Sequence, residues 1–321
     1  MKTILSVDIG GTNSRFAIFS VDDQDNSLIL EKEEWISTND ADSFENLIEI
    51  ASQKINVDDH STFVFAVPGL VNSEHYAKLV NVSWGKVDIL CMKERIQQKG
   101  GNVYLINDFV AQAFGCLSDN IVNPIEIKSG VLSGKKVGLS IVGAGTGLGH
   151  CTLLINENGT LTPIPSQAGQ SEFPFLVEEN EYQLFLQSHL GVERIRYDDV
   201  VSNYGLVNLH FYLTSQLISP IDAANEIGRD SETVRYFARF FGRGCRNYVL
   251  SVLPVYSVLY LSGGVATNLP FLVDNDIFRD EFIQSSEQEV LNQIPIKLTQ
   301  NKSLGLWGAA QYAIYQIQQM K

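Results

Sequence analysis

Residues 4–19 read ILSVDIGGTNSRFAIF, two apolar runs on either side of the turn Asp8-Ile9-Gly10-Gly11-Thr12-Asn13. This pattern predicts a strand, a tight glycine turn and a returning strand. Glycines let the backbone approach an anion, and successive amides form an anion-binding concavity. Thr12 and Asn13 add side-chain hydrogen bonds, and Asp8 is suited to hold Mg²⁺ through its water shell. The stretch predicts a phosphate site; a plain hairpin whose polar side chains satisfy turn amides is the alternative.

A second stretch has the same design near the middle of the chain. Residues 136–142 are apolar, Gly143-Ala-Gly-Thr-Gly-Leu-Gly149 is the turn, and 150–155 return. The threonines of the two turns lie 134 residues apart (146 minus 12), which fits two similarly built α/β domains. A dinucleotide fingerprint is excluded because it needs a helix directly after the glycines, whereas 150–155 are strand-like. We expect a second phosphate turn formed by Gly145, Thr146 and Gly147.

Two other apolar strands end in polar residues or in glycines. The run 103–106 leads into Asn107-Asp108, and the run 255–261 leads into Ser262-Gly263-Gly264. A carboxylate at a strand end can accept the proton of a hydroxyl that attacks phosphorus, although an Asp there is also a common helix cap. The glycine pair suits a backbone approach to adenosine or its ribose, but a strand that ends in glycines is a weak signal alone.

Bulk composition restricts the class of partner. The 321 residues suffice for two domains, and 23 basic against 37 acidic residues give a net charge of −14, so we expect neither nucleic acid nor an anionic membrane as partner. No apolar run approaches the roughly 20 residues of a membrane helix, and an aspartate at position 8 argues against a signal peptide, so we expect a cytoplasmic protein. The four dispersed cysteines indicate neither a disulfide framework nor a zinc site.

In order and spacing, these motifs resemble the bacterial glucokinase family of the sugar kinase/actin/Hsp70 superfamily. The resemblance covers essentially the whole chain and rests on these stretches: Asp8–Ala17, Ile106–Phe109, Gly143–Gly149, Leu261–Val265, Pro68-Gly69 with Asn81–Trp84, and Leu304–Ala309. It implies two ribonuclease H-like (actin-like ATPase) α/β domains, residues 1–108 plus 301–321 and residues 109–300. No Pro/Gly/Ser-rich linker separates the halves, so we expect a ligand cleft between packed domains.

The resemblance also implies an activity and residue roles. The chain would be an ATP- and Mg²⁺-dependent hexose kinase that phosphorylates the 6-hydroxyl of glucose, and similar proteins are often homodimers. Asp108 would be the general base, with Asn81 and Asn107 on the sugar. The ATP phosphates and Mg²⁺ would lie at the two turns, and adenosine near the glycine pair, so that the residues on the nucleotide side are Asp8, Gly10, Gly11, Thr12, Asn13, Gly145, Thr146, Gly147, Gly263 and Gly264.

The departures from the family pattern lie on the sugar side. Where the family reads Gly-Glu-Gly-Gly-His, this chain reads Ser166-Gln167-Ala168-Gly169-Gln170, and Asp198 stands for a further family glutamate. Glutamine still donates and accepts hydrogen bonds, but it loses the charge-assisted strength, about a factor of two per bond. Two alternatives to a glucose kinase follow: a kinase for another hexose or substituted sugar, and a non-catalytic sugar- or nucleotide-binding regulator, since fold alone does not settle function.

Overall fold

The computed structural model describes residues 2–22, 24–131, 137–252 and 257–319. The chain forms two compact units, Met1–Val122 with Ser303–Lys321, and Asn123–Lys302. Helix α3 (Asp108–Gly115), which follows the boundary expected from the sequence, packs against α13 (Leu304–Gln319) and belongs by its contacts to the first unit. The domain limits and the ligand cleft expected from the sequence stay predictions.

The first unit is built on a five-stranded sheet in the order β3-β2-β1-β4-β8. Its strands are β1 (Lys2–Ile9), β2 (Asn13–Val21), β3 (Leu28–Ser37), β4 (Thr62–Val67) and β8 (Asn102–Asn107). The pairs β1–β2 and β2–β3 are antiparallel, whereas β1–β4 and β4–β8 are parallel. The hairpin register places Asp8 opposite Arg15. Because β1, β4 and β8 run in the same direction, their carboxyl ends lie at one edge of the sheet.

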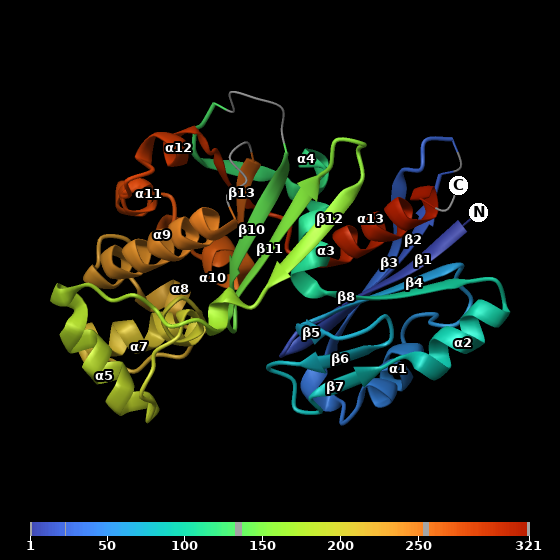
Figure 1. Cartoon of the computed structure of the whole chain (residues 1–321). Helices are drawn as coiled ribbons and strands as arrows, with labels where there is room; N and C mark the ends of the chain where they lie inside the picture. Colours follow the sequence, from blue (N-terminus) through green and yellow to red (C-terminus); the bar gives the residue numbers. More distant parts are fainter. Residues whose placement is uncertain (1, 23, 132–136, 253–256, 320–321) are drawn as a thin grey trace. The chain divides into compact units, whose positions relative to one another are not determined.

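Alternate side chains of β1 face opposite layers, as the two-residue period of a strand requires. Leu5, Val7 and Ile9 belong to a buried cluster that includes residues of α1 (Phe44–Ser52). On the other face, Ser6 Oγ donates to the carbonyl oxygen of Leu306 in α13 at 2.7 Å. Figure 1 shows α13 and α3 on one face of this sheet and α1 on the other. The remaining elements of the unit are η1 (Thr38–Asp40), α2 (Leu90–Gln98), α4 (Asp119–Val122) and a small sheet of β5 (Gly69–Val71), β6 (Tyr76–Leu79) and β7 (Lys86–Asp88).

The second unit repeats this strand path. Its sheet has the order β12-β11-β10-β13-β14-β9. The strands are β9 (Pro124–Lys128), β10 (Gly138–Ala144), β11 (Leu148–Ile155), β12 (Leu161–Ser166), β13 (Ser257–Ser262) and β14 (Ile296–Thr299). Three antiparallel strands are followed by two parallel ones, as in the first unit, and β9 adds an antiparallel edge. The prediction of two similarly built α/β domains is confirmed, and so is the exclusion of a dinucleotide fingerprint, because strand β11 follows the second glycine turn directly.

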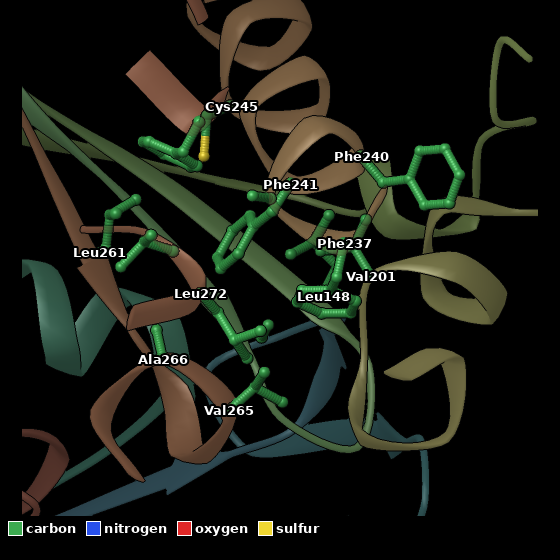
Figure 2. Packing of buried hydrophobic residues seen from close by; sticks show 14 of the residues in the cluster. Leu148, Val201, Phe237, Phe240, Phe241, Cys245, Leu261, Val265, Ala266 and Leu272 are labelled. Atoms are coloured by element: carbon green, nitrogen blue, oxygen red, sulfur yellow. The ribbon is translucent and has the colours of Figure 1, made fainter. Parts of the chain in front are cut away.

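One apolar cluster joins this sheet to its helices. Figure 2 shows its centre, where Phe237 and Phe241 of α9 (Glu232–Val252) lie among Leu148, Leu261 and residues of α10 (Gly263–Asn268). The phenyl rings of Phe237 and Phe241 are fully buried. The other helices of the unit are η2 (Ala168–Gln170), η3 (Val177–Glu179), α5 (Asn180–Leu190), α6 (Tyr197–Val200), α7 (Asn203–Thr214), α8 (Ala223–Glu226), η4 (Pro270–Leu272), α11 (Asp276–Ile283) and α12 (Gln288–Gln293).

Two general expectations can be compared with this fold. In the described part of the chain no helix is both long enough and apolar enough to span a bilayer. The four cysteines are free thiols, with Cys91 exposed and the other three buried. The apolar runs expected from residues 136 and 255 begin at positions that lie outside the described residues.

Candidate active site

The first glycine turn is held in place by the short helix that follows β3. The backbone N–H of Thr38 donates to the carbonyl oxygen of Thr12 at 2.9 Å, and Thr38 Oγ1 donates to that of Gly10 at 2.8 Å. Within the turn, the N–H of Gly10 donates to the carbonyl oxygen of Asn13 at 3.0 Å. The side chains of Thr12 and Asn13 are exposed. The turn is therefore a fixed backbone frame that presents polar side chains to solvent.

Asp8 lies at the end of β1 beside a cation from the returning strand. Its Oδ2 is 3.7 Å from Nη1 of Arg15, whose guanidinium lies 4.2 Å above the ring of Trp35. Burial raises the pKa of Asp8, and the positive charge of Arg15 opposes that rise. A Cβ at Gly305, near the start of α13, would collide with this carboxyl group. Glycine at this position therefore lets the helix approach Asp8 without displacing its carboxyl group.

Asn107, and not Asp108, is the N-cap of α3. Asn107 Oδ1 accepts hydrogen bonds from the backbone N–H groups of Phe109 and Val110 at 2.9 and 3.3 Å, and its Nδ2 donates to the carbonyl oxygen of Gly69 at 3.0 Å. These bonds leave one amide hydrogen of Asn107 for a ligand. The capping role that was the alternative for Asp108 is thus filled by its neighbour.

Asp108 is a carboxyl group that changes its protonation state near neutral pH. Burial, and then the negative charge of Asp8, raise its pKa to about 7, although its Oδ1 accepts the N–H of Phe109 at 3.0 Å. A general base works best when its pKa is near the working pH. A carboxyl perturbed by both burial and a second carboxylate is also typical of a functional site.

The expected sugar loop contacts the first glycine turn. A Cβ added at Gly11 would lie 2.7 Å from the backbone oxygen of Asn81, so only glycine allows the two segments this approach. Asn81 has a left-handed backbone with φ of 61° and is exposed. The structure therefore brings the expected sugar residue Asn81 and the phosphate turn into contact within one unit.

The second glycine turn lies against the expected adenosine motif. The parallel pairing of β10 and β13 places Gly143 opposite Ser262. Gly263 has a φ of +85°, and a Cβ there would collide with the backbone oxygen of Ala144. Its neighbour Gly264 is exposed. Within the turn, the N–H of Gly145 donates to the carbonyl oxygen of Gly147 at 2.8 Å. The two motifs are thus brought together at the ends of adjacent strands.

On the sugar side, Gln170 and Asp198 meet although 28 residues separate them. Gln170 Nε2 donates to Asp198 Oδ2 at 2.6 Å, and the backbone N–H of Leu148 donates to Asp198 Oδ1 at 2.8 Å. Burial raises the pKa of Asp198, and these donors oppose the rise. The side chain of Leu148 lies in the cluster of Figure 2. Gln167 precedes η2, and its side chain is exposed.

Three residues in these surroundings were not anticipated from the sequence. Arg15 could have been found from the hairpin, because residues equally far from the centre of a two-stranded turn face each other across the strands. Gly305 lies in the stretch Leu304–Ala309 that carries the resemblance, but its contact with Asp8 gave no signal, because it depends on a strand nearly 300 residues earlier in the chain. Arg196, whose Nη1 donates to Gln170 Oε1 at 2.8 Å, gave none either.

Comparison with known proteins identifies relatives over nearly the whole length of the chain. Residues 5–316 match the family model described as Glucokinase. The glucokinase of Nostoc punctiforme is 29% identical, with 97% of this chain and 98% of that protein covered. Two solved structures share the fold: the glucokinase of Balamuthia mandrillaris in complex with glucose (19% identity, coverage 96% and 92%, TM-score 0.76), and a ROK family glucokinase of Streptomyces griseus in complex with glucose and AMPPNP (17% identity, coverage 97% and 98%, TM-score 0.66).

Proposed function

The chain belongs to the glucokinase family and is an ATP-dependent sugar kinase, and we propose that it phosphorylates the 6-hydroxyl of glucose with Asp108 as the general base. The observation that carries this assignment is the carboxyl group of Asp108 at the end of β8. Its pKa of about 7 makes it a usable base at neutral pH. A regulator that had lost catalysis would have no use for such a carboxyl.

The reaction that these residues support is an in-line phosphoryl transfer. Ionised Asp108 accepts the proton of the sugar hydroxyl while the hydroxyl oxygen attacks the γ-phosphorus of ATP. The bond from that phosphorus to the β–γ bridging oxygen breaks, and ADP leaves. Asn107 and Asn81 orient the sugar, and the backbone turns at Gly10–Asn13 and Gly145–Gly147 hold the phosphates. Positioning and electrostatics supply most of the rate in this class of reaction.

A magnesium ion fits the surroundings of Asp8. Among the described residues no cluster of three or more His, Cys, Asp or Glu side chains forms a protein cage for a metal ion. A single carboxylate suits Mg²⁺, which keeps most of its waters and shares its remaining ligands with substrate phosphates. The pKa of Asp8 is raised, and a nearby cation would favour its ionised form. Asp8 would hold such an ion, which would supply positive charge to neutralise the phosphates during transfer.

The residues expected on the sugar side are the reason to consider a substrate other than glucose. Gln167, Gln170 and Asp198 stand where the family carries Glu, His and Glu. Gln170 and Asp198 remain adjacent and hydrogen-bonded, which supports a hydroxyl-binding pair. A site built to bond a hydroxyl rejects analogues that lack it, because its polar groups would stay unpaired. A different hexose or a substituted sugar is therefore the second candidate substrate.

The experiment that tests the proposal is a coupled ADP-release assay with MgATP across hexoses, amino sugars and N-acetyl sugars. We expect turnover with glucose that requires Mg²⁺ and is lost in Asp108→Asn. Faster turnover with another sugar would keep the kinase and replace its substrate. No turnover with any sugar, from folded protein that binds ATP, would favour a regulator. A homodimeric state and a cytoplasmic location also belong to the proposal; light scattering and cell fractionation test them.

A further inference from the structure

The amide group of Gln170 is held from both ends. Arg196 Nη1 donates to Gln170 Oε1 at 2.8 Å, and Gln170 Nε2 donates to Asp198 Oδ2 at 2.6 Å. Gln170 is exposed, so this order does not come from burial. An exposed glutamine ordinarily keeps its rotamer freedom. The two bonds therefore fix a side chain that would otherwise sample several conformations.

The chemistry of its two partners decides which way the amide points. A guanidinium can only donate hydrogen bonds, and an ionised carboxylate can only accept them. The oxygen of Gln170 must therefore face Arg196, and its nitrogen must face Asp198. The second hydrogen on Nε2 remains for a ligand, next to Asp198 Oδ2, which has a further lone pair. The pair offers one donor and one acceptor side by side.

Arg196 is itself fixed before any ligand binds. Its Nε and Nη2 donate to Oδ2 and Oδ1 of Asp199 at 3.0 and 2.8 Å, a bidentate pair. Its backbone N–H also donates to Asp199 Oδ2 at 2.8 Å. Bidentate pairing adds geometric specificity that a single contact lacks. Nη1 is therefore aimed at Gln170 by the bonds of the other two nitrogens.

The backbone beside Arg196 also holds the loop that carries Gln170. Arg196 forms a bridge with Glu172. On either side, the N–H of Tyr197 donates to the carbonyl oxygen of Ser171 at 3.0 Å, and that of Phe173 donates to the carbonyl oxygen of Ile195 at 2.8 Å. The loop and the segment before α6 are thus one structural piece. Arg196 and Gln170 therefore belong to the same hydrogen-bonded backbone segment, which keeps the two side chains next to each other.

We propose that Arg196 is a positioning residue of the sugar site, which orients the amide of Gln170 so that Gln170 and Asp198 together bind a hydroxyl of a neutral sugar. The inference rests on the proposed function and names the class of sugar. Arg196, Asp198 and Asp199 carry one positive and two negative charges. An anionic substituent at this point would meet a net negative cluster, so sugars with a carboxylate or phosphate there are disfavoured.

The test is a double-mutant cycle between Arg196 and Gln170, read as glucose affinity by calorimetry without ATP and as KM and kcat with MgATP. Arg196→Met should weaken glucose binding and raise its KM about tenfold, the loss of one hydrogen bond to a charged group, with kcat and the KM for MgATP nearly unchanged. In a Gln170→Ala background, Arg196→Met should have no further effect. Arg196→Lys should restore little, because an ammonium lacks the planar fork by which the guanidinium bonds both Asp199 oxygens and directs Nη1 at Gln170.

The control is Arg235→Met, which removes an arginine that pairs with Glu232 at i, i+3 on the surface of α9, and it should leave both affinity and kinetics unchanged. An equal loss from Arg196→Met in both backgrounds would show a general structural effect and overturn the proposal, as would unchanged glucose affinity. If glucose binds but is not turned over, only the kinase assignment is overturned. The role of Arg196 can still be tested, because the double-mutant cycle can be evaluated from the glucose affinities alone. A wild-type protein that does not bind any neutral sugar of the panel would overturn both.

Discussion

The two glycine turns share one strand scaffold but differ in electrostatics. In each unit an antiparallel hairpin is continued by a parallel strand, β4 beside β1 and β13 beside β10. Asp8 lies four residues before Thr12 in the first unit. In the second unit, the fully buried Val142 lies four residues before Thr146. The first unit therefore places a carboxylate at the end of its central strand, and the second places an apolar side chain at the equivalent point.

The carboxylates of the two units are also stabilised differently. In the first unit the charge of Asp8 works against the ionisation of Asp108. In the second, Asp198 accepts hydrogen bonds from Leu148 and Gln170. A carboxylate whose pKa is raised by burial and by a neighbouring negative charge can exchange a proton near neutral pH, while one that is hydrogen-bonded on both oxygens is suited to holding a ligand. On the proposed function, we expect the proton transfer at Asp108 in the first unit, and Asp198 in the second unit to serve only in binding.

The largest expected effect separates these two roles. Asp108→Asn keeps the size of the side chain but removes the base, so kcat for ADP release should fall on the order of 10²–10⁴-fold, with ATP binding retained. Asp198→Asn places an amide where both oxygens now accept hydrogen bonds, so it should mainly raise the KM for the sugar. A kcat equal to that of wild type in Asp108→Asn would remove Asp108 from catalysis.

The next largest effect concerns backbone geometry at the second turn. Gly263→Ala introduces a Cβ at a positive φ and into the backbone oxygen of Ala144; we expect a loss of about 3 kcal/mol or more in the free energy of unfolding. Gly264→Ala is the matched control, because the nearest atom to the added Cβ would be Asn268 Nδ2, at an ordinary contact distance of 3.8 Å. Denaturant titration of both variants measures the difference. Equal stabilities would show that the approach of β13 to Ala144 is not tight.

The pKa of Asp108 predicts opposite trends for activity and stability. As a base it must be ionised, so kcat/KM should rise with pH and level off above about 7. Its folded pKa lies above the unfolded value of about 3.9, so its contribution to stability is complete below that value and is lost as pH rises through about 7.

Asp108→Asn removes this cost of ionisation in the folded state. The pKa difference of about three units, at about 1.36 kcal/mol per unit, makes the variant more stable than wild type by on the order of 4 kcal/mol at pH 8, and the difference should vanish near pH 4. Unfolding by denaturant at several pH values tests it. A constant difference across that range would mean that Asp108 has an ordinary pKa.

The features that the sequence predicts in this protein depend on local structure, and most of those that it misses depend on tertiary contacts. Turn glycines and apolar runs are short-range signals, so both hairpins and the strand end before Asp108 follow from them. Strand β3 was missed because residues 31–34 read Glu-Lys-Glu-Glu, typical of an exposed edge strand and not of an apolar run. The raised pKa of Asp108 depends on β1 and β8 being brought together by β4. The contact of Arg196 with Gln170 depends on how two loops dock.

The smallest expected effect tests the cation beside Asp8. Arg15 lowers the pKa of Asp8 from 3.7 Å away, and both side chains are partly accessible to solvent, so the coupling is worth at most about 1 kcal/mol. In Arg15→Met, Asp8 holds its proton to higher pH, and it then offers less charge to Mg²⁺. The KM for MgATP should therefore rise a few-fold at low pH, and the rise should shrink as pH increases and Asp8 becomes ionised in both proteins. An increase in KM that does not change with pH would instead mean that Arg15 contacts the nucleotide directly. Arg15→Lys keeps the positive charge, so it should differ little from wild type if the charge of Arg15 is all that matters.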